Sequence, residues 1–153
     1  MKKTREVEGQ ELLFTYFNEM NIISQLSSGI FSKTLPEGLT NSQFNVLNWF
    51  VRVDDVANPG RLSTAFQVTK GAMTNTLKKL QEKHFITVEQ DQNSGRKKIV
   101  RMTPQGRKVR DQAIRNLYPL FNEFAGEFDI PSIQAQLGEV RKVRKYLDEY
   151  RYR

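Results

Sequence analysis

Apolar residues recur every three or four positions through much of this chain, which is the spacing of amphipathic helices. One such stripe occupies the predicted helix 6–31, at Leu12, Leu13, Tyr16, Phe17, Met20, Ile23, Leu26 and Ile30. A second helix is predicted after a cap at Thr40 or Asn41, with its apolar side at Phe44, Leu47, Phe50 and Val51. Both helices need a partner surface for their apolar side.

Two short helices and a hairpin are predicted next. The Asn-Pro-Gly at 58–60 breaks the chain and places a proline in the first turn of a helix that ends near Phe66. Residues 67 and 68 form a turn, and Thr69 caps a helix that runs to about Lys83. The pattern then alternates over 85–89 and 98–102, with Asn-Ser-Gly at 93–95 as the turn. This order predicts a winged helix-turn-helix, which places one helix in the DNA major groove and a hairpin beside it.

The C-terminal part returns to helical spacing. Thr103-Pro104 begins a helix that carries apolar residues as far as Phe128 and is expected to kink at Pro119. Asp129-Ile130-Pro131 ends it, and a last helix is predicted from Ser132 to Tyr150. The first helix and the last two exceed what a DNA-reading unit needs, so we expect them to form a dimer interface. The alternative is that they complete one monomeric core.

The predicted fold is therefore mainly α with a small β-hairpin wing (α+β), in a single domain over 1–153. Residues 40–103 form the winged-helix DNA-binding region, with the helix-turn-helix at about 59–83 and the wing at about 85–102. Residues 6–33 and 104–151 form N- and C-terminal dimerisation helices.

Charge is concentrated in the predicted reading unit. Residues 60–110 contain 12 Lys or Arg against 3 Asp or Glu, a net of +9, whereas the whole chain is +7. The remainder therefore sums to −2, and the basic character comes from one region. A localised basic face is typical of nucleic-acid-binding proteins.

Composition excludes several other classes. The chain has no cysteine and a single histidine, His84, which excludes disulfide frameworks, thiol redox sensing and His- or Cys-rich metal sites. No Gly-rich phosphate loop or nucleophile–base pair is visible, so we expect no enzyme, no metal and no cofactor. No apolar run approaches the roughly 18 residues of a membrane span, and the N-terminus does not resemble a secretory signal. We expect a cytoplasmic, nucleoid-associated protein without membrane contact.

The candidate DNA-reading residues lie on the predicted helix 69–83 and in the hairpin. The side opposite Met73 and Leu77 presents Thr74 and Asn75, which suit a thymine methyl and a bidentate contact to adenine. Lysines on the same helix reach phosphate or guanine, and Arg96 in the hairpin suits the minor groove. The full candidate set is Thr69, Lys70, Gly71, Thr74, Asn75, Lys78, Lys79, Arg96, Lys97 and Lys98. The plain alternative is a solvated polar face. We assign His84 no function, because its place at a helix end is typical of a cap or of a residue at positive φ.

A ligand cavity is a separate hypothesis. Aromatic residues near the junction of the reading unit and the end helices are candidates to line it: Phe14, Phe17, Phe31, Trp49, Phe50 and Tyr118. The same residues are equally typical of a core, and on the sequence alone core is the favoured interpretation.

An ordered set of short motifs resembles the MarR (multiple antibiotic resistance regulator) family over nearly the full length. The motifs are Leu39-Thr40 with residues 43–47, the block 68–80, the basic hairpin and the Met-Thr-Pro-Gln-Gly at 102–106. The resemblance implies a homodimeric winged-helix protein, usually a repressor of nearby genes. It also implies that the end helices form the dimer interface, and that a small aromatic or lipophilic ligand often binds near them.

Two positions depart from that family's pattern. The family's wing usually has an acid two residues before its arginine, whereas this chain has Ser94 before Arg96, leaving Ser94 or Asp91 to hold the arginine. His84 stands where the family commonly has glycine. The sequence thus predicts a dimeric, sequence-specific regulator that binds a pseudo-palindromic double-stranded DNA site, with a small-molecule effector as a further expectation. The alternatives are a nonspecific architectural DNA binder and a winged-helix protein-interaction module.

Overall fold

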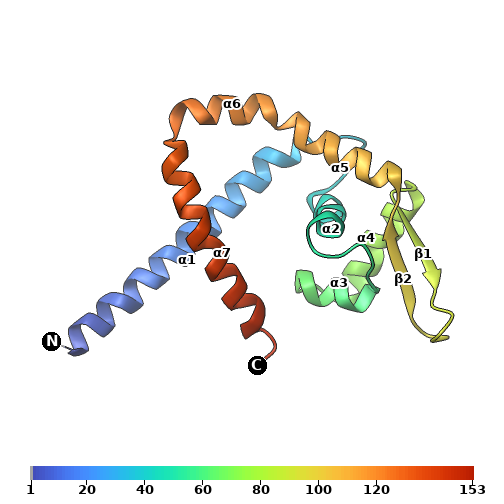
Figure 1. The fold of residues 1–153 in the computed structure, drawn as a ribbon, viewed down its shortest axis with the longest axis horizontal. Coiled ribbons are helices and arrows are strands. Elements are labelled where there is room, and N and C mark those ends of the chain that lie inside the picture. Colours follow the sequence, from blue (N-terminus) through green and yellow to red (C-terminus); the bar gives the residue numbers. More distant parts are fainter. Residues whose placement is uncertain (1) are drawn as a thin grey trace. The chain divides into compact units, whose positions relative to one another are not determined.

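The computed structural model describes residues 2–153, with side chains from Arg5 onward. The chain forms two compact units, one ending at Asn116 and the other beginning at Leu117. The first contains α1 (Lys2–Ser32), α2 (Asn41–Arg52), α3 (Pro59–Phe66), α4 (Lys70–Glu82), β1 (Ile86–Gln90), β2 (Lys98–Met102) and α5 (Pro104–Asn116). The second contains α6 (Tyr118–Glu127) and α7 (Ile130–Tyr150). Figure 1 shows this order, which confirms a mainly helical fold with one hairpin.

The hydrophobic core belongs to the segment from α2 to α5. α2 packs against α4, α5 and β2, and α3 packs against α4 and β2. The largest side chains with no meaningful exposure come from α2, α3, α4, β1 and β2: Leu47, Leu62, Leu80, Ile86, Val46 and Val100. On α2 the buried side is shifted from the predicted one. Gln43, Val46 and Trp49 are buried with Leu47 and Phe50, whereas Phe44 and Val51 are only partly buried. Most of the apolar surface removed from water thus stabilises the winged-helix region.

Local sequence explains the helix starts. Thr40 forms a capping box with Gln43, in which each side chain bonds the other residue's backbone N–H. Asn58 caps α3 by accepting the Arg61 N–H at 2.7 Å, with Pro59 in the first turn. Thr69 caps α4 by accepting the Ala72 N–H at 3.1 Å. These caps confirm the predicted starts of all three helices.

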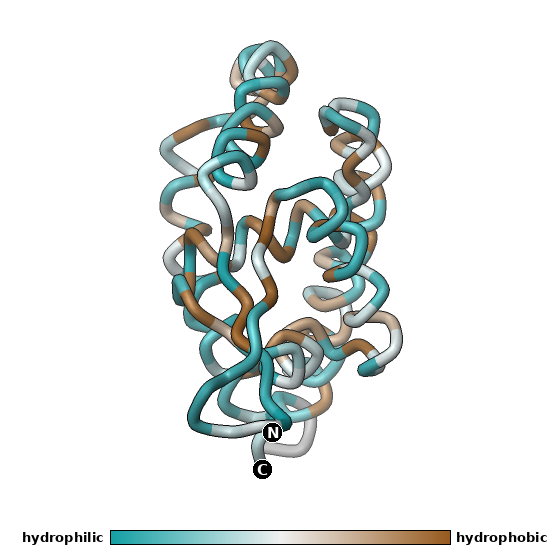
Figure 2. The backbone as a smooth tube through the Cα atoms, turned by 90° about the vertical axis from the view of Figure 1, so that its right-hand side faces the viewer, coloured by the Kyte–Doolittle hydropathy of each residue, from teal (hydrophilic) through white to brown (hydrophobic). Residues whose placement is uncertain are grey.

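The hairpin is antiparallel, with Ile86 opposite Met102 and Gln90 opposite Lys98. A further bridge joins Ala57, in the loop before α3, to Val100 through two backbone hydrogen bonds of 3.1 and 2.7 Å. Figure 2 shows apolar stretches in the two strands and a hydrophilic loop between them. Because Ala57 pairs with β2, the start of α3 is tied to the hairpin.

A threonine and a glycine join the hairpin to α5. The Thr103 hydroxyl donates to the His84 carbonyl at 2.6 Å and accepts the Gly106 N–H at 3.0 Å. A Cβ atom on Gly106 would lie 2.1 Å from the Phe85 carbonyl oxygen, closer than any two such atoms approach. The Thr-Pro-x-Gly segment therefore holds the start of α5 against the junction of α4 and β1, and only glycine fits its last position.

The C-terminal helices differ from the prediction in two places. We expected one helix kinked at Pro119, but helix α5 ends at Asn116 and α6 begins at Tyr118. Proline lacks the N–H that a continuous helix needs and its ring crowds the preceding turn, so the chain breaks instead of bending. The last helix begins at Ile130 and not at Ser132, because Pro131 is accommodated in its first turn.

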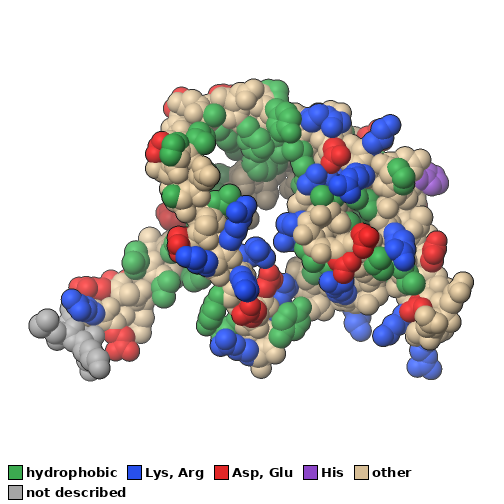
Figure 3. All heavy atoms as spheres, in the orientation of Figure 1, with side chains coloured by type: hydrophobic (Ala, Val, Ile, Leu, Met, Phe, Trp, Pro, Cys, Tyr) green, Lys and Arg blue, Asp and Glu red, His purple; other side chains and the backbone are tan. Residues whose placement is uncertain are grey.

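Helices α1, α6 and α7, called the end helices from here on, have no buried side chain among the described residues. Helix α5, which the sequence assigned to the dimerisation helices, instead buries Val109 and Ala113. On α1, Leu12 is 70% exposed and Phe14 is 73% exposed. On α7, Ile133, Leu137 and Leu147 are exposed along the predicted apolar side. Figure 3 shows hydrophobic side chains at the surface of the segments formed by α1 and by α6. Within one chain, these apolar stripes stay in contact with solvent.

Candidate nucleic-acid interface

The helix α4 divides into a buried side and an exposed side. Met73, Leu77 and Leu80 are buried in the core. The predicted reading residues are all exposed: Thr69, Lys70, Gly71, Thr74, Asn75, Lys78 and Lys79. The Thr74 hydroxyl donates to the Lys70 carbonyl at 2.8 Å, which leaves its methyl group and its oxygen lone pairs for an outside partner. The side of α4 that the sequence assigned to DNA is thus the side that faces solvent.

The turn between α3 and α4 has the left-handed residue that a tight connection requires. Gln67 has φ 51° and ψ 46°, and its N–H bonds the carbonyls of Ser63 and Thr64. Val68 follows with a backbone bond to Ser63 of 3.1 Å. The two helices with this short turn form the predicted helix-turn-helix.

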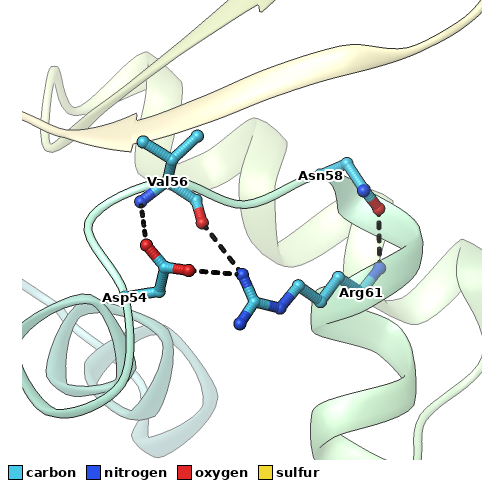
Figure 4. Close-up of polar contacts among 4 residues, drawn as sticks. All are labelled: Asp54, Val56, Asn58 and Arg61. Atoms are coloured by element: carbon cyan, nitrogen blue, oxygen red, sulfur yellow. Dashed lines mark hydrogen bonds and ion pairs between the residues drawn. The ribbon is translucent and has the colours of Figure 1, made fainter.

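An ion pair fixes the loop that leads into α3 (Figure 4). The Arg61 guanidinium donates to Asp54 Oδ2 at 2.7 Å and to the Val56 carbonyl at 3.3 Å, and it lies 4.9 Å from the centre of the Trp49 ring. Two hydrogen bonds lower the pKa of Asp54 below its usual value: the one from Arg61 has the larger effect, and the one from the Val56 N–H has the smaller. The carboxylate is therefore held ionised against α3. The pair was not predicted from the sequence, because the loop pattern does not reveal which cation Asp54 meets.

The wing loop, residues 91–97, is closed by its own backbone. The Asp91 N–H donates to the Lys97 carbonyl at 2.8 Å, and the Asp91 carboxylate accepts the Asn93 N–H at 2.9 Å. The Ser94 N–H donates to the Asp91 carbonyl, and the Ser94 carbonyl accepts the Lys97 N–H, both at 3.2 Å. Lys98 is the first residue of β2 and pairs with Gln90, so the loop itself carries two of the three predicted cations.

Arg96 has no carboxylate within ion-pair distance in the part of the chain that the structure describes. Asp91 is engaged with the loop backbone, as described above. The Gln90 side chain instead donates to the Gly95 carbonyl at 2.7 Å, on the peptide that leads into Arg96. In this wing, an amide on the strand fixes the backbone beside the arginine, and the carboxylate that was expected from the family pattern is not used.

A groove of about 450 Å³ joins the reading helix to the wing. Lys70 and Thr74 of α4 line one side, and the wing contributes the cationic side chains of Arg96, Lys97 and Lys98. The third wall is Asn58, Pro59 and Gly60 at the start of α3. These last three residues were predicted only to start a helix, although a helix N-terminus between basic walls favours a phosphate. The groove includes five predicted site residues, whereas Thr69, Gly71, Asn75, Lys78 and Lys79 lie outside it on the exposed side of α4.

His84 has φ 61°, and its N–H bonds the Gln81 carbonyl at 2.9 Å. It ends the helix in the left-handed conformation, as predicted for a histidine at this junction.

The six aromatic residues predicted to line a ligand cavity do not share one environment. Trp49 and Phe50 are both 4% exposed and stack edge to face, with ring centres 5.4 Å apart, within the hydrophobic core. Phe14 and Phe17 are exposed on α1, and Phe31 is half-buried. Tyr118 is exposed in the second unit. Trp49 and Phe50 thus serve as core, and a cavity that uses the whole set stays a prediction.

Comparison with known proteins supports the fold. Residues 37–97 match the model of the MarR family, and no curated protein sequence matches the chain. No helix within the described part of the chain is both long enough and apolar enough to cross a membrane.

Three solved structures illustrate the likeness. The regulator BldR from Sulfolobus solfataricus is 24% identical, with a TM-score of 0.73 over 87% of this chain and 94% of that one. A MarR variant from E. coli, in complex with operator DNA, is 20% identical, with a TM-score of 0.69 over 86% and 94%. BpsR from Bordetella bronchiseptica, whose DNA binding is regulated by 6-hydroxynicotinic acid, is 20% identical, with a TM-score of 0.69 over 85% and 98%. These structures confirm the fold.

Proposed function

We propose that this chain, whose residues 37–97 match the model of the MarR family, is a homodimeric transcriptional regulator that binds double-stranded DNA at specific sequences. One observation carries the proposal: the groove in which the start of α4, the start of α3 and the cationic wing converge. Phosphate contacts from Lys70, Arg96 and Lys97 would supply most of the affinity. The exposed side of α4 would then supply base discrimination through Thr74 and Asn75.

Dimerisation is supported by the apolar side chains that the end helices leave exposed. Burial of these residues between two copies removes them from water and places two reading helices on one duplex. Two copies of α4 in successive major grooves would lie about one helical turn apart, roughly 34 Å, on a pseudo-palindromic site. The same proposal includes action as a repressor of nearby genes and a cytoplasmic, nucleoid-associated location.

Ligand control is the finer part of the proposal. The relative BpsR is regulated by a small aromatic acid. A small lipophilic or aromatic effector of this chain would bind near the end helices, where Phe14 and Phe17 are exposed. Titration of such acids against the protein–DNA complex tests it, and a broad panel that releases no DNA would leave a regulator without an effector of this kind.

Selection of bound DNA from a random pool at physiological salt tests the DNA-binding role itself. We expect a palindromic consensus with half-sites about one helical turn apart. Enrichment of no sequence, despite tight binding, would instead indicate an architectural DNA binder. Failure to bind duplex DNA at all would indicate a protein-interaction module.

The base-reading role of Asn75 is tested separately. Asn75→Ala should relax the consensus at one position of each half-site, at a cost of roughly 1–3 kcal/mol in specific binding. Thr76→Ala is a matched control, because Thr76 is half-buried on the same helix and its hydroxyl bonds the Ala72 carbonyl. An unchanged consensus for the Asn75 variant would remove that residue from the readers.

A further inference from the structure

The Arg61 guanidinium, on α3, contacts both the loop 53–58 and helix α2. Its Nη1 donates to Asp54 Oδ2 at 2.7 Å and to the Val56 carbonyl oxygen at 3.3 Å. Its central carbon lies 4.9 Å from the centre of the Trp49 ring, which is itself buried in the core. Figure 4 shows the Arg61 side chain reaching from α3 back to the loop. One side chain of α3 therefore holds the loop between α2 and α3 in place.

The same loop also pairs with the wing. Ala57 is buried, and it exchanges two backbone hydrogen bonds with Val100 of β2, at 3.1 and 2.7 Å. Asn58 follows Ala57 directly and is the first residue of the groove wall 58–60. Lys98, two residues before Val100, belongs to the opposite wall. The bridge between Ala57 and Val100 therefore sets the spacing between the start of α3 and the wing.

The contacts of Arg61 restrict the position of the loop more than they add to stability. The Arg61 and Asp54 side chains are 47% and 40% exposed, and ion pairs at such exposure contribute little to the free energy of unfolding. Both ends of the loop are nevertheless fixed, because Asp54 accepts the Val56 N–H at 3.3 Å and Asn58 accepts the Arg61 N–H at 2.7 Å. Arg61 is not one of the residues that line the groove.

We propose that Arg61 is a positioning residue for DNA binding: with Asp54 it holds the loop 53–58 against β2, so that the start of α3 and the wing meet one duplex at a fixed spacing. The inference rests on the proposed DNA-binding function, and it assigns Arg61 no contact with the duplex. A groove whose walls are already in place loses less conformational entropy on binding than one whose walls move. An acid in the loop beside a phosphate-binding groove thereby favours DNA binding, because it holds Arg61.

The sign of a charge effect separates this role from a direct contact. Asp54→Asn removes a negative charge from the loop beside the groove, and electrostatics alone would then tighten binding to DNA. An Arg61 that contacted phosphate itself would also be released to do so. We expect the opposite result, a selected operator bound at least threefold more weakly, because the loop is no longer held. Unchanged or tighter binding would overturn the positioning role.

Glu89→Gln is the matched control for charge. It removes the same negative charge from an exposed position on β1. Operator binding by this variant should be unchanged or tighter, since Glu89 has no printed role in the loop or its bridge to β2. A loss as large as that of Asp54→Asn would show that the effect is not specific to the loop and would overturn the proposal.

A double-mutant cycle tests whether Arg61 and Asp54 act as one unit. Arg61→Gln should weaken operator binding at least threefold, and the double variant with Asp54→Asn should bind no more weakly than Arg61→Gln alone. Losses that multiply would show that Arg61 contributes to DNA binding independently of Asp54, and would overturn the proposal. Circular dichroism at the assay temperature checks that each variant is folded.

Amide hydrogen exchange without DNA tests the geometry itself. In Arg61→Gln and in Asp54→Asn, the amides of Ala57 and Val100 should exchange at least threefold faster, because each donates across the bridge that the loop supports. The amide of Leu47, inside α2, should change less than twofold. Equal acceleration of all three amides, or of none, would overturn the positioning role. Because this measurement uses no duplex, it stands even if the wild-type chain binds no operator, a result that would overturn only the proposed function.

Discussion

The winged-helix region and the end helices of this chain contain similar apolar patterns but bury them very differently. From α2 to β2, large aliphatic side chains such as Leu47, Leu62 and Leu80 are fully enclosed. Helix α1 is longer than any of those helices, yet no described side chain on it is buried. Helical spacing of apolar residues therefore indicates a surface that needs a partner, but does not say whether that partner lies in the same chain.

The contrast explains how one chain can carry two tasks. The enclosed region is a stable frame on which α4 and the wing are held at a fixed geometry, as a binding site requires. In the proposed dimer, a second copy would cover the apolar stripes of the end helices, and assembly and folding would then be partly the same event.

The largest expected difference concerns stability. Leu80→Ala, at a residue with no exposure, should lower the free energy of unfolding by about 2–5 kcal/mol, because it removes buried methyl groups and leaves a cavity. Leu12→Ala, at 70% exposure, should change it by less than about 0.5 kcal/mol in dilute protein. Urea titration measures both. Equal losses would mean that α1 belongs to the same core and would remove the contrast.

The second prediction concerns assembly. Ile23→Glu places a charge on the exposed apolar side of α1 and should weaken dimerisation by about 2 kcal/mol or more, while α2–β2 stays folded. Sedimentation velocity over a concentration series measures the dimer, and circular dichroism checks the fold. Ser24→Glu, at an exposed polar position beside it, is the matched control. A dimer that tolerates Ile23→Glu would place the interface elsewhere.

The third prediction concerns how the wing is held. Gln90→Ala removes the bond to the Gly95 carbonyl and should weaken DNA binding by about 0.5–1.5 kcal/mol, because Arg96 is no longer fixed. Gln92→Ala, at an exposed position in the wing loop, is the control and should have no effect.

A double-mutant cycle with Arg96→Ala gives this experiment its specificity. The effect of Gln90→Ala should disappear when Arg96 is already absent, because the glutamine acts through the arginine. Additive losses would show that Gln90 contacts DNA or the fold independently.

The smallest expected effect is pH-dependent. The pKa of Asp54 is lowered in the folded chain, chiefly by the Arg61 hydrogen bond. A carboxyl with a depressed folded pKa stabilises the fold above its unfolded pKa, and that contribution is lost as the pH falls through the folded value. Asp54→Asn should therefore be less stable than the wild type at neutral pH. The difference should shrink as the pH falls below 3.8, the ordinary value for this carboxyl. Thermal unfolding of both proteins between pH 2 and pH 7 measures this difference in stability, because that range spans the titration of aspartates. A difference that stays constant with pH would contradict the ion-pair assignment.

The helix-turn-helix was predictable from local residues alone. Thr40, Asn58 and Thr69 are local capping residues whose effect needs no distant partner, so each helix start was predictable. The exposed side of α4 was predictable as well, because the spacing of Met73, Leu77 and Leu80 leaves only one side for solvent. The left-handed backbone of His84 followed from its place at a helix end.

Which distant residues meet depends on how the elements pack in the folded chain. The bond from Lys83 to the carbonyls near residue 37 and the pairing of Ala57 with Val100 depend on packing between elements far apart in the chain. The same holds for the convergence of Asn58, Lys70 and Arg96 on one groove. The sequence shows that no acid stands two residues before Arg96. It does not show that Gln90 bonds the Gly95 carbonyl instead, because that hydrogen bond depends on the register of the hairpin. Local patterns fix local geometry, whereas contacts between elements are set by how those elements pack.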